Sequence, residues 1–159
     1  MDATFAGLSE GARVRLATDA FLLEGDPDAA ERLLHAAALR TATARGSGTL
    51  EHRARAVMAE LHVRRARRRR RHAGAEPATG VVGVLRVLTP RQRAATILGH
   101  VDKLSTGDIA EALGVPEAAA ASALRDGTGA VAAALGLPCD VIDAGEEVEV
   151  TSHRARGGP

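Results

Sequence analysis

Residues 88–124 read LTPRQRAATILGHVDKLSTGDIAEALGVPEAAAASAL, and this stretch decides the fold. Its capping residues predict three helices in succession. Thr89 followed by proline is typical of a helix start, because threonine caps the free N–H groups and proline has none to lose. Ser105 or Thr106 caps the second helix, and Gly114 supplies the left-handed residue that ends it.

The turn between the second and third helices is very short, because Pro116 opens the third helix two residues after Gly114. Two short helices joined by a three- or four-residue turn containing glycine have the form of a helix–turn–helix. The second helix of such a unit usually enters the major groove of DNA. The residues predicted to be buried recur at helical spacing and are Ala94, Ala95, Ile97 and Leu98, then Ile109, Ala110 and Leu113.

This stretch resembles region 4 of bacterial extracytoplasmic-function sigma factors. That region typically opens with Leu-Pro-Pro-Arg-Gln-Arg and continues with Leu-Ser-x-x-Glu-Ile-Ala-x-x-Leu-Gly before a recognition helix. Residues 88–116 follow both patterns. The resemblance implies a domain that places the helix from Pro116 to about Arg125 at an upstream promoter element.

Three more helices are predicted before residue 72, at 9–24, at about 28–43 and from Leu50 to about Arg71. Ser9, Asp26 followed by proline, and Thr49 are their start signals. The expected apolar faces are Val14, Ala17, Phe21 and Leu22 in the first; Ala30, Leu33, Leu34, Ala37 and Ala38 in the second; and Ala54, Val57, Met58, Leu61 and Val63 in the third.

Residues 21–41 read FLLEGDPDAAERLLHAAALRT and resemble region 2 of the same sigma factors, commonly Tyr-Leu-Leu-x-Gly-Asp followed by Ala-Glu-Asp-Leu-x-Gln-Glu-Ala. The resemblance implies a domain that binds the polymerase clamp and the downstream promoter element. It makes Leu33, Leu34 and Arg40 the candidate polymerase contacts. The positions that match the family pattern are Leu22, Leu23, Gly25, Asp26, Ala30, Glu31, Leu33, Ala37 and Arg40.

The predicted fold is all-α, with two small helical domains at 1–72 and 81–135. Residues 73–80, AGAEPATG, form a flexible linker by composition, and 136–159 form an acidic tail.

Three local features of the second domain and tail are also predicted. VVGVLRVL, residues 81–88, can be a short helix or a strand. The glycines of residues 125–129 are expected to interrupt the third helix of the second domain. A strand is expected at 147–151.

Charge is concentrated in one place. The net charge is only +1, but seven arginines and no acid lie between residues 61 and 72. On a helix end these arginines can neutralise phosphates, although they can also be a solvated surface that complements the helix dipole. The predicted DNA contacts are Arg64, Arg65, Arg67, Arg68, Arg69, Arg70 and Arg71, called the arginine block below, together with Arg91, Arg93, Ser122 and Arg125.

The chain departs from the family where contacts are expected. Ala119, Ala121 and Ala123 stand where the recognition helix usually carries Thr, Lys and Arg, and base edges are read by hydrogen bonds. Aromatics make up 1% of the chain, so base stacking is also missing. Two alternatives therefore remain beside promoter recognition: a degenerate sigma-like scaffold that contacts other proteins without initiating transcription, and nonspecific nucleic-acid binding through the arginine block.

Other functional classes are not indicated. The chain lacks a glycine-rich phosphate loop and a nucleophile elbow, so no enzymatic activity is expected. Cys139 is the single cysteine, and no metal or other cofactor is expected. No apolar run approaches the ~18 residues of a membrane span, so a cytoplasmic protein is expected. The expected partners are core RNA polymerase, promoter DNA and an anti-sigma or other regulatory protein, with no membrane.

Overall fold

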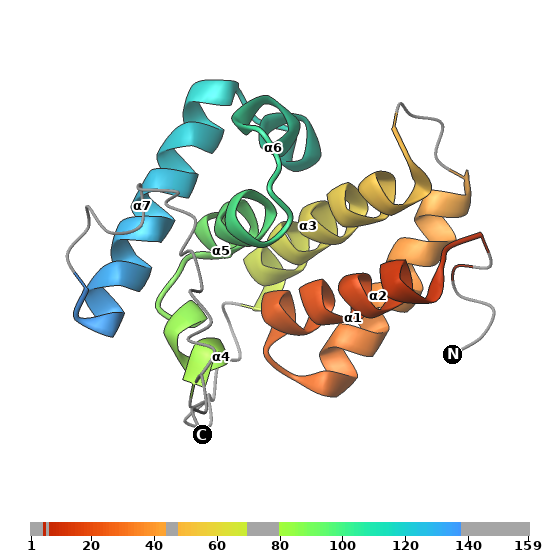
Figure 1. Ribbon diagram of the computed structural model, residues 1–159, viewed down its shortest axis with the longest axis horizontal. Helices are drawn as coiled ribbons and strands as arrows, with labels where there is room; N and C mark the ends of the chain where they lie inside the picture. The colour runs from red at the N-terminus through yellow and green to blue at the C-terminus, as the bar shows by residue number, and fades with distance from the viewer. Residues whose placement is uncertain (1–4, 6, 44–47, 70–79, 138–159) are drawn as a thin grey trace, which may run out of the picture.

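The computed structural model describes residues 5, 7–43, 48–69 and 80–137, and this part of the chain is all-helical, as predicted. Figure 1 shows two groups of helices side by side. The elements are α1 (Glu10–Glu24), α2 (Pro27–Thr43), α3 (Leu50–Arg69), α4 (Gly80–Leu85), α5 (Pro90–Thr96), a π-helical continuation η1 (Ile97–Val101), α6 (Thr106–Leu113) and α7 (Glu117–Leu135).

The predicted capping residues set the helix ends. Ser9 accepts a hydrogen bond from the backbone N–H of Ala12 at the start of α1. Thr89 and Ser105 each begin a capping box, in which side chain and backbone bond reciprocally across three residues. Ser105 rather than Thr106 is therefore the cap of α6. Gly114 ends that helix in the left-handed conformation with φ 61°.

The buried face of α1 differs from the predicted one. Val14 is 56% exposed and Phe21 is 39% exposed. The buried stripe is instead Leu16, Ala20 and Leu23, which are spaced by four and three residues and face α2 and α3. The periodicity of α1 was misassigned because two apolar residues seven apart define a second, exposed line on the same helix.

The faces of the other helices are close to those predicted. Leu33 and Ala37 of α2 and Met58 of α3 are fully buried, and Ile109 of α6 is also inaccessible. Leu34, Val57, Leu61, Val63 and Leu113 pack at the edge of the same core.

The two halves of the described chain, 5–69 and 80–137, pack on one another. Helix α3 lies beside α1 and α2 on one side and against α5 and α6 on the other (Figure 1). The buried apolar residues of both halves form one continuous cluster. Apart from Gly80, which begins α4, the predicted linker lies outside the described residues.

Helix α7 is continuous from Glu117 to Leu135, so the predicted break at 125–129 is wrong. Gly127 is buried in the middle of α7 where the helix crosses α5. A β-carbon on Gly127 would lie 2.3 Å from the Thr96 hydroxyl oxygen. The glycine therefore permits a close helix crossing rather than ending the helix.

Two other local predictions have different outcomes. The stretch from residue 81 is helical and belongs to α4, so the strand reading of that stretch is wrong. The strand expected at 147–151 lies outside the described residues. Within the described part of the chain, no helix is long and apolar enough to cross a membrane.

Substituting Gly127→Ala should lower the free energy of unfolding by about 2 kcal/mol, because the new methyl group overlaps Thr96 and approaches the Gln92 carbonyl oxygen at 3.1 Å. Gly129→Ala in the same helix is the matched control, since nothing lies within 4 Å of its β-carbon position. That change should stabilise the protein by about 0.5–1 kcal/mol. Urea unfolding of both variants checks this, and equal effects would contradict the close crossing.

Candidate nucleic-acid and polymerase interface

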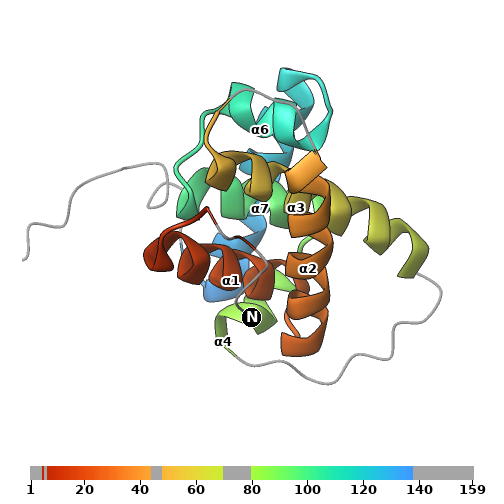
Figure 2. The ribbon, with the colours of Figure 1, turned by 90° about the vertical axis from the view of Figure 1, so that its right-hand side faces the viewer.

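The arginine block begins in the C-terminal end of α3, which contains Arg64, Arg65, Arg67, Arg68 and Arg69. That end of the helix projects beyond the other helices (Figure 2). Arg64 is exposed and pairs with Glu60 at 2.9 Å, one turn earlier, whereas Arg65 is half-buried. The helix continues through Arg67, Arg68 and Arg69, and Arg70 and Arg71 lie outside the described residues.

The N-terminal half of α7 carries few hydrogen-bonding side chains. Ala119 and Ala121 are half-buried, and Ala123 is buried. The Ser122 hydroxyl donates to the Asp126 carboxylate at 3.2 Å, so its donor is already occupied within the helix. Arg125 is exposed. Of the two candidates on this helix, Arg125 alone therefore keeps a donor group available at the surface.

The two arginines of α5 occupy different environments. Arg91 is partly exposed, whereas Arg93 is 8% exposed. The Arg93 guanidinium donates to the carbonyl oxygen of Leu85 from Nε at 2.8 Å and from Nη2 at 2.5 Å, and from Nη1 to that of Leu23 at 3.0 Å. Burial lowers the pKa of Arg93 from its ordinary value. In this structure Arg93 joins the two halves and is not available to a phosphate.

The candidate polymerase contacts on α2 also differ from one another in exposure. Leu33 is fully buried in the core, and Leu34 packs partly against it. Arg40 is exposed at the end of α2, with its guanidinium 3.9 Å from the Glu60 carboxylate of α3. Leu33 therefore packs in the core beneath the surface of α2, and Arg40 is the candidate that a partner can reach.

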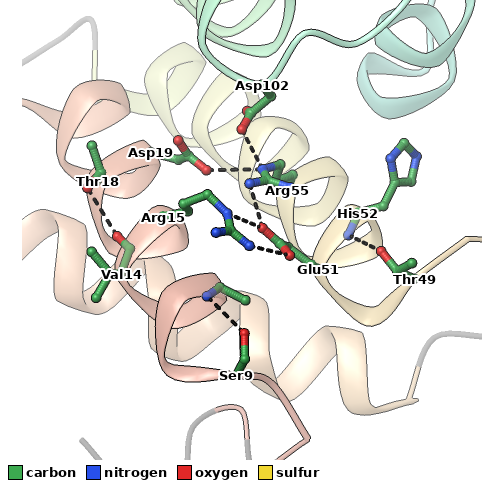
Figure 3. Close-up of polar contacts among 11 residues, drawn as sticks. Ser9, Val14, Arg15, Thr18, Asp19, Thr49, Glu51, His52, Arg55 and Asp102 are labelled. Atoms are coloured by element: carbon green, nitrogen blue, oxygen red, sulfur yellow. Dashed lines mark hydrogen bonds and ion pairs between the residues drawn. The ribbon is translucent and has the colours of Figure 1, made fainter.

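A polar cluster that the sequence patterns do not predict lies between the halves (Figure 3). Arg55 of α3 lies at its centre, and its Nε is 2.5 Å from Asp102 and 3.2 Å from Asp19 of α1. Its Nη2 is 2.7 Å from Glu51, which also accepts from Arg15 of α1 at 2.8 Å. Asp102 follows η1, so the Arg55–Asp102 ion pair crosses from one half to the other.

The surroundings shift the pKa values of the acids in this cluster in opposite directions. The hydrogen bond from Arg15 lowers the pKa of Glu51. Burial raises the pKa of Asp19. Burial and the neighbouring Asp19 carboxylate raise the pKa of Asp102 to about 7, although Arg55 opposes this shift. The cluster lines an open pocket of about 360 Å³ between α1, α3 and the end of η1.

Part of the polar cluster could have been read from the sequence. Glu51 and Arg55 are four residues apart on a predicted helix, which is the spacing of an ion pair. Asp19 lies between Leu16 and Leu23 on the buried stripe of α1, and a buried acid needs a partner. Asp102 gives no such signal, because only the folded chain places it beside α3. Among the described residues, no three His, Cys, Asp or Glu side chains are grouped so that they could hold a metal ion.

No family model and no curated protein matches the chain. Among solved structures, one similar chain comes from the co-crystal structure of the sigma factor RpoE with the anti-sigma factor NepR from Bartonella quintana. The two chains are 18% identical with a TM-score of 0.62, and the likeness covers 79% of this chain and 92% of the other. At this identity, the likeness shows that the chain has a sigma-factor-like all-α fold.

Replacing Arg93→Met should destabilise the protein by about 1–3 kcal/mol, because the buried carbonyl oxygens of Leu23 and Leu85 lose the hydrogen bonds that Arg93 donates. Arg91→Met on the same helix removes the same charge from a more exposed site and should change stability by less than about 0.5 kcal/mol. Urea unfolding measures both. An Arg93→Met protein as stable as the Arg91→Met protein would contradict the bridging role.

Proposed function

We propose that this protein is a sigma-factor-like regulator that binds core RNA polymerase and promoter DNA in the cytoplasm. The observation that carries the proposal is the likeness of fold, which extends over 92% of the length of a sigma factor. The region 2 pattern at 21–41 falls on the end of α1 and on α2, and the region 4 pattern at 88–116 runs from α5 to the turn after α6, in the family's order. The fold and the sequence patterns therefore support the same proposal from independent observations.

In this proposal each half has its own task. The first half binds the polymerase through the exposed end of α2, where Arg40 lies, and the arginine block on α3 contacts phosphates. The second half is a helix–turn–helix in which α6 and α7 are joined by residues 114–116. Its α7 approaches an upstream element with Arg125, and Arg91 of α5 is a second cationic group.

The docked halves are the resting form in this proposal. Helix α3 lies against α5 and α6, so the two proposed DNA-facing helices belong to one compact core. Two promoter elements separated along DNA require the halves to move apart. Binding to polymerase supplies the free energy for that opening, because a partner shifts a two-state equilibrium toward the form that it binds more tightly.

A second candidate is a sigma-like scaffold that binds proteins without initiating transcription. The surface of α7 favours it, because Ser122 is bonded to Asp126 and Ala123 is buried. The sigma factor of similar fold was co-crystallised with an anti-sigma factor, which supports a regulatory protein as the partner.

The two candidates differ in a transcription experiment with the purified full chain and core RNA polymerase. Binding to the polymerase together with specific run-off transcripts from genomic promoter fragments is the expected result. Binding without transcripts would support the scaffold instead. Failure to bind the polymerase would overturn both candidates as polymerase-directed functions.

The phosphate contacts are tested by changing Arg67–Arg70 to alanine. Each lost contact should reduce the dependence of log affinity on log salt by about 0.9, so four lost contacts should reduce the slope by roughly 3 to 4. DNA binding is measured by fluorescence anisotropy between 50 and about 200 mM salt. The control Arg32→Ala removes one exposed arginine from α2 and should leave the slope unchanged. An unchanged slope in the fourfold variant would remove these arginines from the interface.

A further inference from the structure

The polar cluster between the halves contains more negative than positive charge. Three carboxylates, those of Asp19, Glu51 and Asp102, surround the two guanidinium groups of Arg15 and Arg55 (Figure 3). If all five groups are ionised, the cluster carries one uncompensated negative charge. One bound proton makes it neutral.

Burial makes the uncompensated negative charge energetically unfavourable. The Asp102 side chain is 3% exposed, that of Asp19 is 4% exposed, and that of Arg55 is 13% exposed. A carboxylate away from water is stable only when its charge is compensated. Arg55 is shared by all three acids, so it cannot neutralise each of them. The docked arrangement therefore favours protonation of one carboxyl group.

The geometry selects Asp102 as the proton-binding group. Its Oδ1 pairs with Arg55, whereas its Oδ2 is buried and has no hydrogen-bond partner among the described residues. Glu51 stays ionised because Arg15 and Arg55 both donate to it.

We propose that docking of the two halves takes up one proton at the Asp102 carboxyl group, so that the docked arrangement is strengthened as the pH falls from 8 to 6. The proposal goes beyond the sigma-like function and does not depend on it, because it rests on the contact between the halves alone. It makes the closed form of the protein sensitive to acidification near neutral pH.

The sign follows from the difference between the two states. In the open chain the Asp102 carboxyl is in water, with a pKa near the ordinary value of 3.8, whereas burial in the docked state raises this pKa to about 7. The docked state therefore binds the proton more tightly. The free energy of docking is therefore most favourable at low pH. It becomes less favourable as the pH rises from about 4 to about 7, and it is constant above that range. Between pH 8 and pH 6 the docking constant should rise about tenfold.

The other charged groups near the contact are the same in the wild type and in Asp102→Asn, so comparing the two proteins removes their contribution. Asp19 and Arg15 face Asp102 from α1, Glu51 and Arg55 face it from α3, and Lys103 beside it is exposed. His52 of α3 also faces Asp108 of α6 across the contact. Because His52 is present in every variant, the contribution of Asp102 is the difference between the wild type and Asp102→Asn.

The test follows the distance between the halves by energy transfer between dyes. The dyes are attached through Ala42→Cys on α2 and Ala134→Cys on α7, both exposed, in a chain carrying Cys139→Ser. Urea is added until half of the molecules are open, and the docking constant is measured at pH 6 and at pH 8. The halves can separate before the helices unfold or at the same urea concentration. In both cases Asp102 reaches water in the open state, so the pH dependence can be measured.

The expected outcome is a docking constant about tenfold larger at pH 6 in the wild type, beyond the part that remains in Asp102→Asn. Asparagine resembles the protonated carboxyl in shape and cannot ionise, so that variant should lose this difference. The control Glu111→Gln, which removes an exposed acid from α6, should keep it. Equal pH dependence in the wild type and in Asp102→Asn would overturn the proposal. So would the loss of the difference in Glu111→Gln.

Discussion

The buried guanidinium of Arg93 holds together the point where the two halves meet. It donates to Leu23 near the end of α1 and to Leu85 at the end of α4, so one side chain links the carbonyl groups of two helix ends. Gly25 lies two residues after Leu23. Its backbone is left-handed and lies so close to Val82 that a β-carbon on Gly25 would be 2.9 Å from that side chain. The start of the second half is thereby fixed against the end of α1.

The rest of the core is built from small residues. Alanines fill much of the buried cluster, and each buries less apolar area than a leucine or an aromatic residue would. Close approach of the helices compensates for this, as at Gly127 against Thr96 and at Gly99, where a β-carbon would lie 2.7 Å from Leu124. Such packing leaves little room for added volume. It also makes the stability depend strongly on polar links such as those of Arg93 and Arg55.

The sequence predicted the elements better than the contacts between them. Thr89, Ser105 and Gly114 mark helix ends by local backbone chemistry, so their roles could be read without the fold. The role of Gly127 could not, because a glycine at a helix crossing and a glycine that ends a helix look alike until the neighbouring helix is known. The bridging role of Arg93, which was predicted as a DNA contact, and the role of Asp102 could not be predicted for the same reason: Leu23 and Arg55, their partners, are far away in sequence. The sigma-like fold was predicted because its patterns are local, whereas Leu33, placed among polymerase contacts by resemblance, is a core residue.

The two halves of this sigma-like fold rest against one another, and in the proposed function they separate to act. The most direct test is the distance between α2 and α7, measured by energy transfer in the free protein and in its complex with core RNA polymerase. The account predicts a short distance in the free chain and a clearly longer one in the complex. A stable complex in which this distance is unchanged would contradict it.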